Sequence, residues 1–442
     1  MPTEPQFHRS AMLQRLEHEA FDVLVVGAGV TGAGVALDAA ARGLRVALIE
    51  RDDFASGTSS KSSKMAHGGL RYLQQGDVDL VYQALRERQR LFRNAPHLVS
   101  LLPFMIPVTK GRDGVVPRAV ARALGSALWA YDTTGGWRIG RIHRRVRRNA
   151  AIAHIPTMRA DRLAWAYVYF DTGVDDARLV LTLARTAAAK GAVVANRCRL
   201  VGLAHRADGS IEGATVAADG REFTVSATTV VNAAGVWSDD VRALDDGVHP
   251  DSIRPAKGVH ITVPWEKVRN DIAVVIPVPK DKRSLFVVPW GPKPDGTFRF
   301  TFVGTTDTDY DGPLDDPQCT KADIDYVLRA LNASVTTGVT EDDVTGVWAG
   351  LRPLVKAATS GRTADLSRHH KVNDDGSGVI TITGGKLTTY REMAEDTVDA
   401  VSARLGTKSK CRTRRLPLLG GDGYREPAAG TVDAHQIGRA HV

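Results

Sequence analysis

The sequence predicts an α/β fold in which a parallel sheet is joined to a second domain with a mixed sheet. Two apolar runs, FDVLVVG and LRVALIE, flank an alanine-rich helical stretch and together form a βαβ unit of about thirty residues. Between residues 255 and 305, the segments HITVP, IAVVIPV, SLFVVPW and FRFTFVG lie too close together for crossover helices. The chain of 442 residues is also too long for one ordinary core, so we expect two or three domains.

The N-terminal elements follow from the apolar pattern. Residues 21–27 and 44–50 are the two buried strands, and residues 30–42 form the helix between them. The loop 57–73 has no apolar period of 2 or 3.6 and therefore buries no regular face. Residues 77–94 form an amphipathic helix. Its predicted apolar face consists of Val78, Val81, Leu85 and Phe92.

The later elements are predicted in the same way. Strand 165–170 precedes a helix over 176–190 with an acidic first turn, and Asp-Gly turns divide residues 193–225 into short antiparallel strands. Thr229–Ala233 and Val379–Thr383 are further buried strands. The last strand leads through a Gly-Gly-Lys turn into a helix. The apolar face of that helix consists of Ala394, Val398, Val401 and Leu405.

The composition is that of a soluble globular protein, with 43% hydrophobic and 24% charged residues. The net charge of +8 favours acidic partners such as phosphorylated metabolites, anionic lipids or nucleic acid. Cys198, Cys319 and Cys411 share no metal-ligand or redox spacing, so we expect a reduced intracellular protein with structural cysteines and no metal site. No apolar run has the length of a signal-peptide core or a membrane span, so membrane contact would be peripheral.

A dinucleotide-binding motif lies between the first strand and the first helix. Gly27, Gly29 and Gly32 form GxGxxG, which permits a tight turn, close approach of a pyrophosphate and close packing of helix on strand. Glu50 ends the second strand, where an acidic side chain would bind ribose hydroxyls. NAD and FAD both satisfy this pattern. The position of the motif at the start of the chain, without a second GxGxxG for a nicotinamide domain, favours FAD.

Two further segments suit a flavin. The strand TVVNAAG, Thr229–Gly235, ends in small residues that allow a chain crossing to pack beside a cofactor. Gly384, Gly385 and Lys386 follow the last strand and precede a helix, whose N-terminal amides suit the negative charge of a reduced flavin. Each segment also has a structural interpretation without a ligand. The first would be an ordinary core strand, and the second an ordinary capped helix after a strand.

Several stretches in this order resemble the FAD-dependent glycerol-3-phosphate dehydrogenases, especially the bacterial aerobic, respiratory enzymes. They are VGAGVTGAGVALDAAARGLRVALIE, SGTSSKSSKMAHGGLRYL, DDARLVL, VNAAGVWSD, KGVHITVP, FVVPW, VGTTDTDY, AGLRPL and GGKLTTYREMAED. The resemblance implies a glutathione-reductase-type FAD-binding Rossmann domain, a mixed-sheet α+β substrate domain over the flavin, and a helical C-terminal domain. It also implies oxidation of sn-glycerol 3-phosphate to dihydroxyacetone phosphate by hydride transfer from C2 to flavin N5, with electrons passed to membrane quinone.

On this resemblance the chain divides into five parts. They are an N-terminal extension (1–20), a discontinuous FAD-binding domain (21–110, 150–250 and 345–410), a basic and apolar insertion (111–149), a substrate-binding domain (251–344) and the start of a truncated C-terminal domain (411–442). The last residues, QIGRAHV, match the translation of a sequencing-library adapter. We therefore expect an artefactual end and a helical C-terminal domain that is largely missing.

The resemblance also implies a cofactor site and a substrate pocket that share the loop 57–73. The expected cofactor-binding residues are Gly27, Gly29, Gly32, Glu50, Ser59, Ser60, His67, Gly68, Gly69, Ala234, Gly235, Gly384 and Gly385. Ser59 and Ser60 would lie near the pyrophosphate, and Gly68 and Gly69 against the isoalloxazine. The expected substrate-binding residues are Arg71, Tyr72, Lys386 and Thr388, and the expected catalytic residues are His260 and Arg352.

The chemistry explains these residue types. A phosphate dianion needs several cations, and the planar fork of arginine suits it well. Oxidation at C2 also needs a base for the hydroxyl proton, for which His260 is the candidate because its pKa is expected near working pH. Arg352 would instead stabilise the developing alkoxide. The division of roles stays open, as do the plain interpretations of a satisfied strand histidine and a buried ion pair.

The segment Trp137–Asn149 holds six arginines and follows the apolar stretch GSALWAY. An anionic membrane surface would attract it, and a solvated charged face explains it equally well. Nucleic acid is not expected as a partner, because no nucleic-acid fold motif accompanies the charge. Three hypotheses follow: a quinone-linked dehydrogenase at the cytoplasmic face of the cell membrane, an oxidase that reduces O₂, and an FAD-binding protein without turnover. A homodimer is left open.

Overall fold

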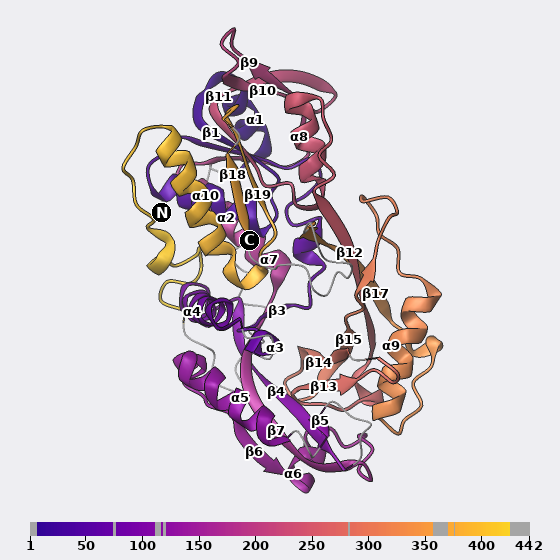
Figure 1. The fold of residues 1–442 in the computed structure, drawn as a ribbon. Coiled ribbons are helices and arrows are strands. Elements are labelled where there is room, and N and C mark those ends of the chain that lie inside the picture. The colour runs from indigo at the N-terminus through magenta and orange to yellow at the C-terminus, as the bar shows by residue number, and fades with distance from the viewer. Residues whose placement is uncertain are drawn as a thin grey trace.

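A computed structural model describes residues 7–73, 77–110, 116–117, 121–281, 283–356, 370–374 and 376–424 of the chain. Within these residues the chain forms two sheets that lie one beyond the other along the molecule (Figure 1). None of the helices in this part of the chain is both long enough and apolar enough to span a membrane.

The first sheet has eight strands among the described residues and is built on the predicted βαβ unit. In chain order they are β1 (Ala20–Val26), β2 (Val46–Ile49), β8 (Val193–Ala195), β9 (Arg199–His205), β10 (Ile211–Ala218), β11 (Arg221–Asn232), β18 (Lys371–Asp374) and β19 (Val379–Thr383). The spatial order β18–β19–β11–β1–β2–β8 is parallel apart from β18, and β9 and β10 form an antiparallel extension of β11. Strand β2 is buried along its whole length, as its continuous apolar run predicts.

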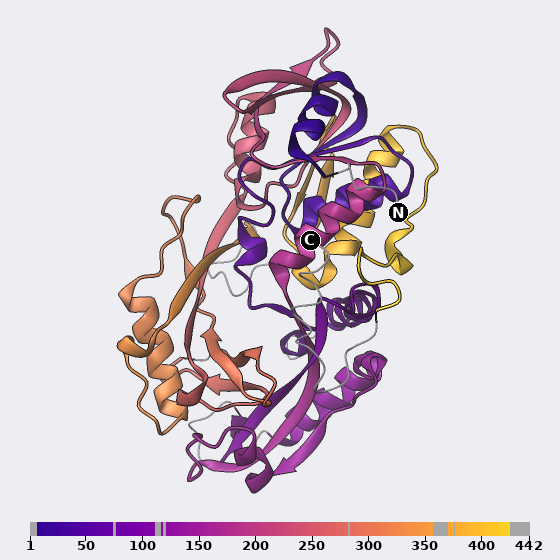
Figure 2. The same ribbon diagram turned by 180° about the vertical axis from the view of Figure 1, so that it is seen from behind.

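Three helices pack together beside this sheet. Helix α2 (Val30–Ala41) lies between α7 (Asp176–Ala189) and α10 (Tyr390–Arg404), and it also contacts β1 and β2 (Figures 1 and 2). The predicted apolar face of α10 is confirmed, since Ala394, Val398 and Val401 are buried and Leu405 is partly buried. The shorter helix α8 (Ser238–Asp246) follows β11.

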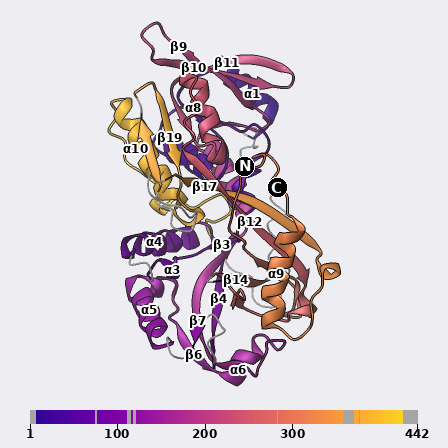
Figure 3. The ribbon, with the colours of Figure 1, turned by 45° about the vertical axis from the view of Figure 1, so that its right-hand side comes forward.

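The second sheet has eleven strands among the described residues. They are β3 (Met65–Ala66), β4 (Val99–Thr109), β5 (Val116–Pro117), β6 (Arg144–Arg147), β7 (Leu163–Val174), β12 (Ile253–Pro264), β13 (Ala273–Pro277), β14 (Ser284–Pro292), β15 (Phe298–Gly304), β16 (Thr308–Asp309) and β17 (Gly346–Val355). Their main order is β16–β12–β15–β14–β13–β4–β7–β3, with β17 on β12, β5 on β4 and β6 on β7. The long antiparallel pair β12–β17 leads from the side of the first sheet into the second (Figure 3).

Helices cover both faces of the second sheet. The helices not yet named are α1 (Arg9–His18), which packs on the first sheet, and α3 (Leu70–Leu73), α4 (Val78–Asn94), α5 (Ala121–Thr134), α6 (Arg148–Ala153) and α9 (Lys321–Ser334). On β13, Val274 and Ile276 join the core under α9, whereas Ala273 and Val275 join the core under α4 and α5. This alternation is the period of two expected for a strand. The core under α4 and α5 also contains Met65, so this face of the sheet supports the loop 57–73.

The strand pairing corrects the expected domain limits. The ranges 21–110, 150–250 and 345–410 are wrong as limits of the first domain, because β4, β7 and β17 belong to the second sheet. Strand β4 pairs with β7 and β13, and β17 pairs with β12. The range 111–149 is likewise no separate insertion, since α5 packs on the second sheet and β6 pairs with β7. These pairings join segments that are far apart in sequence, which apolar patterns do not reveal.

Three smaller expectations also need comment. Within the expected N-terminal extension, α1 packs on β8 and β11 and buries Leu16 completely. Val78 does not lie on the buried face of α4 and is 51% exposed, because the helix begins there, after its N-cap Asp77. The described residues of 411–442 end at Tyr424, so QIGRAHV lies outside the described residues.

Candidate active site

The turn between β1 and α2 is packed so closely that it requires glycine. At Gly27 φ is +96°, and a Cβ there would lie 2.8 Å from the carbonyl oxygen of Ala233. A Cβ at Gly32 would lie 1.8 Å from the carbonyl oxygen of Gly27. The N-terminus of α2 therefore lies directly on the turn, and its first amides are available to an anion.

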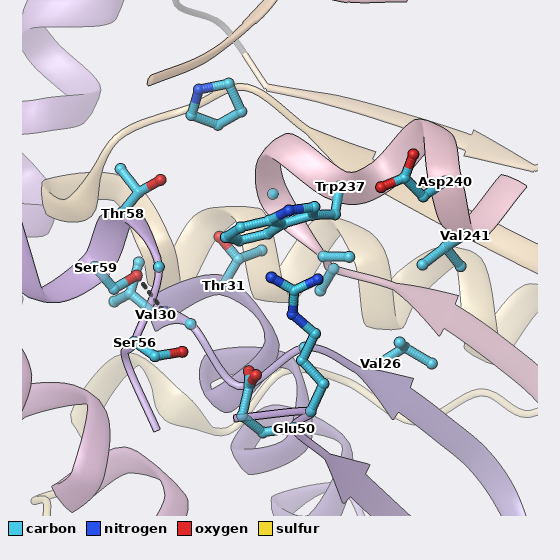
Figure 4. A pocket seen from close by; sticks show the side chains of 18 of the residues that line it. Val26, Val30, Thr31, Glu50, Ser56, Thr58, Ser59, Trp237, Asp240 and Val241 are labelled. Atoms are coloured by element: carbon cyan, nitrogen blue, oxygen red, sulfur yellow. Dashed lines mark hydrogen bonds between the residues drawn. The ribbon is translucent and has the colours of Figure 1, made fainter. Parts of the chain in front are cut away.

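A cavity of about 650 Å³ opens beside this turn (Figure 4). Ten of the residues expected in the site line it, namely Gly27, Gly29, Glu50, Ser59, Ala234, Gly235, Arg352, Gly384, Gly385 and Lys386. Most of them follow the carboxyl ends of β1, β2, β11 and β19. Ligands of open α/β sheets bind at these strand ends, so the cavity lies where the sequence predicts a cofactor.

Glu50 lies at one end of the cavity and also holds the glycine turn. Its carboxylate accepts hydrogen bonds from the backbone N–H groups of Ala28, at 2.8 Å, and Asp52, at 3.0 Å. Burial raises the pKa of this carboxyl above its ordinary value. The acidic side chain therefore faces the cavity from the end of β2, as the ribose-binding prediction requires (Figure 4).

Ser59 and Ser60 differ in their placement. The hydroxyl oxygen of Ser59 accepts a hydrogen bond from the N–H of Val30 at 2.9 Å, in the first turn of α2. Ser60 does not line the cavity, and its N–H donates to the carbonyl oxygen of Ala55 at 3.1 Å. Only the first of the two serines thus adjoins the helix terminus where a pyrophosphate is expected.

The sequence analysis missed a group of side chains near Glu50. The guanidinium of Arg51 lies 4.2 Å from the centre of the Trp237 ring, and both side chains line the cavity. Asp315 accepts hydrogen bonds from Arg51 at 2.5 Å and from the indole N–H of Trp237 at 3.0 Å. Arg51 directly follows Glu50, and Trp237 lies in the stretch VNAAGVWSD, so these two residues carried a signal. Asp315 had none.

His260 lies on β12 beside the cavity and does not line it. Its Nε2 is 2.9 Å from the hydroxyl oxygen of Ser63, and its ring stacks on Trp348 with centroids 4.8 Å apart. Its Nδ1 has no hydrogen-bond partner among the described residues. Burial, together with the charges of Arg352 and Lys64, lowers the pKa of His260 to about 3. The expected pKa near working pH is therefore wrong, and the ring is neutral.

Arg352 lies on β17 and reaches the cavity. Its guanidinium donates to Asp307 at 3.1 Å, to the hydroxyl of Thr305 at 3.1 Å and to the carbonyl of Thr306 at 3.3 Å. The ion pair with Asp307 agrees with a structural role for this residue. Its position on the cavity wall, where the side chain is 24% exposed, agrees with the expected catalytic role.

The residues 67–72 and Thr388 lie close together outside the cavity lining. The hydroxyl of Thr388 donates to the carbonyl oxygen of His67 at 3.2 Å. The ammonium of Lys386 lies 3.7 Å from the centre of the Tyr72 ring. Arg71 lies in α3, and its side chain is outside the described part of the structure. The structure therefore brings the expected substrate residues Tyr72, Lys386 and Thr388 together.

Comparison with known proteins agrees with this geometry. The family described as FAD dependent oxidoreductase matches residues 22–391. Glycerol-3-phosphate dehydrogenase 2 of Mycobacterium bovis is 44% identical over 422 residues, which cover 94% of this chain and 69% of that protein. A mitochondrial glycerol-3-phosphate dehydrogenase of Arabidopsis thaliana is 38% identical over 447 residues, which cover 97% of this chain and 68% of that protein.

Solved structures give the same result. The glycerol-3-phosphate dehydrogenase from Bacillus halodurans complexed with FAD is 31% identical, with a TM-score of 0.74, and the match covers 98% of this chain and 73% of that one. The L-α-glycerophosphate oxidase from Mycoplasma pneumoniae with FAD bound shares the fold, with a TM-score of 0.66 at 16% identity, over 92% of this chain and 99% of that one. FAD is thus the cofactor of this fold and fits the cavity beside the glycine turn. The chain belongs to the FAD-dependent glycerol-3-phosphate dehydrogenase family.

Proposed function

We propose that the chain oxidises sn-glycerol 3-phosphate to dihydroxyacetone phosphate, with FAD accepting both electrons from C2. The observation that carries this proposal is that Arg352 and Lys386, from segments far apart in sequence, line the same cavity as the glycine turn. Cations that converge on a cofactor site suit a small phosphorylated substrate.

The residues around the cavity fit FAD. The amides of the first turn of α2, with Ser59, would hold the pyrophosphate, and Glu50 would hold the ribose hydroxyls. Gly384 and Gly385, which have φ of +75° and +78°, would let the backbone approach the ring system. When bound there, FAD supplies a two-electron acceptor.

The chain itself must handle the phosphate and the hydroxyl proton. As C2 loses its hydride, its hydroxyl loses a proton and the carbonyl forms. His260 is the proposed acceptor of this proton, since one nitrogen of its neutral ring carries a lone pair, and the direction of the hydrogen bond between Nε2 and Ser63 decides which nitrogen that is. Arg352 would stabilise the negative charge that develops on the oxygen, and Lys386 would bind the phosphate.

Anaerobic reduction of the bound flavin tests this function. Adding sn-glycerol 3-phosphate to the FAD-loaded protein should bleach the visible absorption of the flavin, whereas glycerol, which lacks the phosphate, should not. Dithionite serves as the control that the bound flavin can be reduced. A flavin that dithionite bleaches and sn-glycerol 3-phosphate leaves oxidised would disprove the proposal.

The electron acceptor is proposed to be a membrane quinone, with the protein bound peripherally at the cytoplasmic face of an anionic membrane. The support is a set of exposed apolar side chains on α4, on α5 and in the segment that follows α5, and these elements contact one another. These are five of the ten exposed large hydrophobic side chains among the described residues: Val78, Tyr82, Trp129, Trp137 and Ile142. Exposed arginines occur in the same stretch of chain at Arg141, Arg144, Arg145, Arg147 and Arg148. Exposed apolar side chains together with cations suit an anionic lipid surface.

Sedimentation with liposomes that contain anionic lipid tests this membrane contact. The double variant Trp129→Ala/Trp137→Ala should bind less, while Phe300→Ala, which removes an exposed aromatic ring elsewhere, should bind like the parent. Replacing Arg144, Arg145 and Arg147 by Gln should weaken binding at low salt on the order of a hundredfold, at about 1 kcal/mol per charge. Equal binding by all of these proteins would contradict the assignment.

The alternative acceptor is O₂, as in an oxidase. Both enzymes would share the substrate residues, so only the fate of the electrons separates them. Turnover that yields stoichiometric hydrogen peroxide, without faster turnover on added quinone analogue, would replace the quinone proposal by the oxidase.

A further inference from the structure

The loop His67–Tyr72 is held at Gly68 by a buried polar network. The N–H of Gly68 donates to Oδ1 of Asp171 on β7, with a donor–acceptor distance of 2.9 Å. The same oxygen accepts from the guanidinium of Arg88 at 2.5 Å and from the hydroxyl of Tyr131 at 2.8 Å. Three donors from three parts of the fold therefore converge on a single carboxylate oxygen.

This network is shielded from water. Arg88 is fully buried, Tyr131 is 1% exposed and Asp171 is 2% exposed. Burial and the charge of Asp171 raise the pKa of Tyr131 well above its ordinary value, so its hydroxyl keeps its proton and remains a donor. Arg88 also donates to the carbonyl oxygens of Phe170 at 2.9 Å and Gly136 at 3.2 Å. Its two terminal nitrogens thus have several acceptors, whereas its Nε has none among the described residues.

The loop is pressed directly onto the network. A Cβ at Gly68 would lie 2.3 Å from the hydroxyl oxygen of Tyr131 and 2.3 Å from Cδ2 of Leu85. At Gly69, where φ is +77°, a Cβ would lie 2.5 Å from the ring of Tyr72. The position of the network therefore sets the position of the backbone, which in turn sets that of Tyr72.

Helix α4 connects the loop His67–Tyr72 to the turn Leu387–Thr389, which precedes α10. Arg88 of α4 reaches Asp171, and the preceding residue, Glu87, pairs with Arg391 on α10 through two hydrogen bonds of 2.6 and 2.8 Å. Arg391 follows the turn Leu387–Thr389 by two residues. Neighbouring side chains of one helix thus fix both segments that meet where Thr388 donates to His67.

A buried ion pair of this kind is a poor source of stability. Removing two charges from water costs about as much as their attraction returns, and apolar residues of the same volume often stabilise a core equally well. What the pair supplies is a fixed geometry, because charge-assisted bonds to one oxygen allow little movement.

We propose that Arg88, Tyr131 and Asp171 are positioning residues, which act through Gly68 to hold the loop His67–Tyr72 at its working distance from Lys386 and Thr388. This inference rests on the proposed function and on the family resemblance, which places Gly68 and Gly69 against the flavin ring. Its role is to keep the geometry of hydride transfer, since small misplacements of reacting groups slow a reaction strongly.

Two substitutions of matched chemistry test the proposal. Tyr131→Phe removes one donor to Asp171 without exposing a charge. Tyr169→Phe is its control, because Tyr169 is also buried and its ring centroid lies 6.1 Å from that of Tyr131, but no hydrogen bond joins it to Asp171. Asp171→Asn is the stronger variant, and Tyr131→Phe keeps the test valid if that variant does not fold.

The expected result is a change in catalysis and in the flavin environment. Tyr131→Phe should lower the rate of anaerobic flavin reduction by sn-glycerol 3-phosphate at saturation about threefold or more, with the KM changed less. It should also shift the visible circular dichroism of the bound flavin. FAD content should stay unchanged, and Tyr169→Phe should match the parent in all of these measurements.

The flavin spectrum separates failure of this inference from failure of the proposed function. A parent protein that sn-glycerol 3-phosphate does not reduce, combined with a spectral shift in Tyr131→Phe only, would disprove the function and support the positioning role. Parent-like reduction rates and spectra in Tyr131→Phe would overturn the positioning role. The positioning role would also be overturned if Tyr131→Phe lowered the melting temperature as much as Tyr169→Phe does and changed neither the reduction rate nor the flavin spectrum.

Discussion

At the scale of single residues, burial sets the chemistry of His260 more than any neighbouring charge does. The ring is 2% exposed, and burial is the largest cause of its low pKa, followed by the cations Arg352 and Lys64. A neutral imidazole is the form that a base requires, but so low a pKa also makes the ring a weak base, so the proposed role requires this pKa to rise when the substrate is bound. The low pKa also implies that protonation of His260 does not limit the reaction near neutral pH.

The first prediction concerns stability in acid. Above about pH 6.5 the ring of His260 is neutral in the folded and unfolded states; below it, the unfolded chain binds a proton that the folded ring refuses until about pH 3. The free energy of unfolding should therefore decrease as the pH is lowered from about 6.5 to about 3. This contribution lowers the free energy of unfolding of the parent by on the order of 3 kcal/mol between pH 7 and pH 4, and it should be absent in His260→Gln. Denaturant unfolding of both proteins at the two pH values measures it, and equal losses would contradict the low pKa.

The catalytic role of His260 is a separate matter. The same His260→Gln variant should lose most of its rate of flavin reduction, because the glutamine amide is too weak a base to accept the hydroxyl proton. A rate close to that of the parent would rule out His260 as the base.

At the scale of elements, close packing makes the turn between β1 and α2 work. Gly27 adopts a positive φ, and Gly32 lies against the backbone of Gly27, so the helix terminus and the strand end share one small space. This arrangement places the first amides of α2 at the cavity. The glycines of the motif therefore serve both the fold and the cofactor.

The second prediction tests this packing. Gly32→Ala would place its Cβ 1.8 Å from the carbonyl oxygen of Gly27, so the helix must move. We expect loss of bound FAD and destabilisation of at least about 1–3 kcal/mol. Flavin absorption of the purified protein and its denaturant midpoint measure both effects. Gly202→Ala in β9 is the control, because its Cβ would meet only the side chain of Thr215 at 3.9 Å; an FAD-replete Gly32→Ala would refute the argument.

At the scale of the whole molecule, contacts between the two halves enclose the cofactor cavity. Asp315 lies between β16 of the second sheet and α9, yet it contacts Arg51 and Trp237 on the first half of the molecule. Both of these side chains line the cavity, and Figure 4 labels Trp237 among them. The second half therefore helps to close the end of the cavity near Glu50.

The third prediction concerns this closure. Asp315→Asn should speed the release of FAD about twofold to fivefold, since it weakens an exposed ion pair worth at most about 1 kcal/mol. The difference from the parent should shrink at high salt because exposed charges are screened. Asp311→Asn in the same segment is the control. Fluorescence recovery of released FAD gives the rates, and identical rates at low salt would rule out the closure.

The two sheets also show what apolar patterns can and cannot predict. The βαβ unit, the antiparallel strands after residue 198 and the strand before Gly384 were recognisable, because each has a local period or a local motif, whereas β8 (Val193–Ala195) was wrongly expected to be antiparallel and pairs in parallel with β2. The membership of β4, β7 and β17 in the second sheet was not recognisable, because strand pairing joins segments distant in sequence. The same limit hid Asp171, which contacts Gly68 from more than a hundred residues away.

The sequence by itself determined the glycine turn, Glu50, the order of the motifs and the chemistry expected of the cations. These are properties of short segments, in which spacing along the chain is also spacing in the structure. Only the tertiary structure decided that His260 is neutral, that Asp315 closes one end of the cavity, and that Arg88, Tyr131 and Asp171 hold the loop beside Tyr72. Burial and pairing across the fold produce all three, and neither is encoded in any one segment.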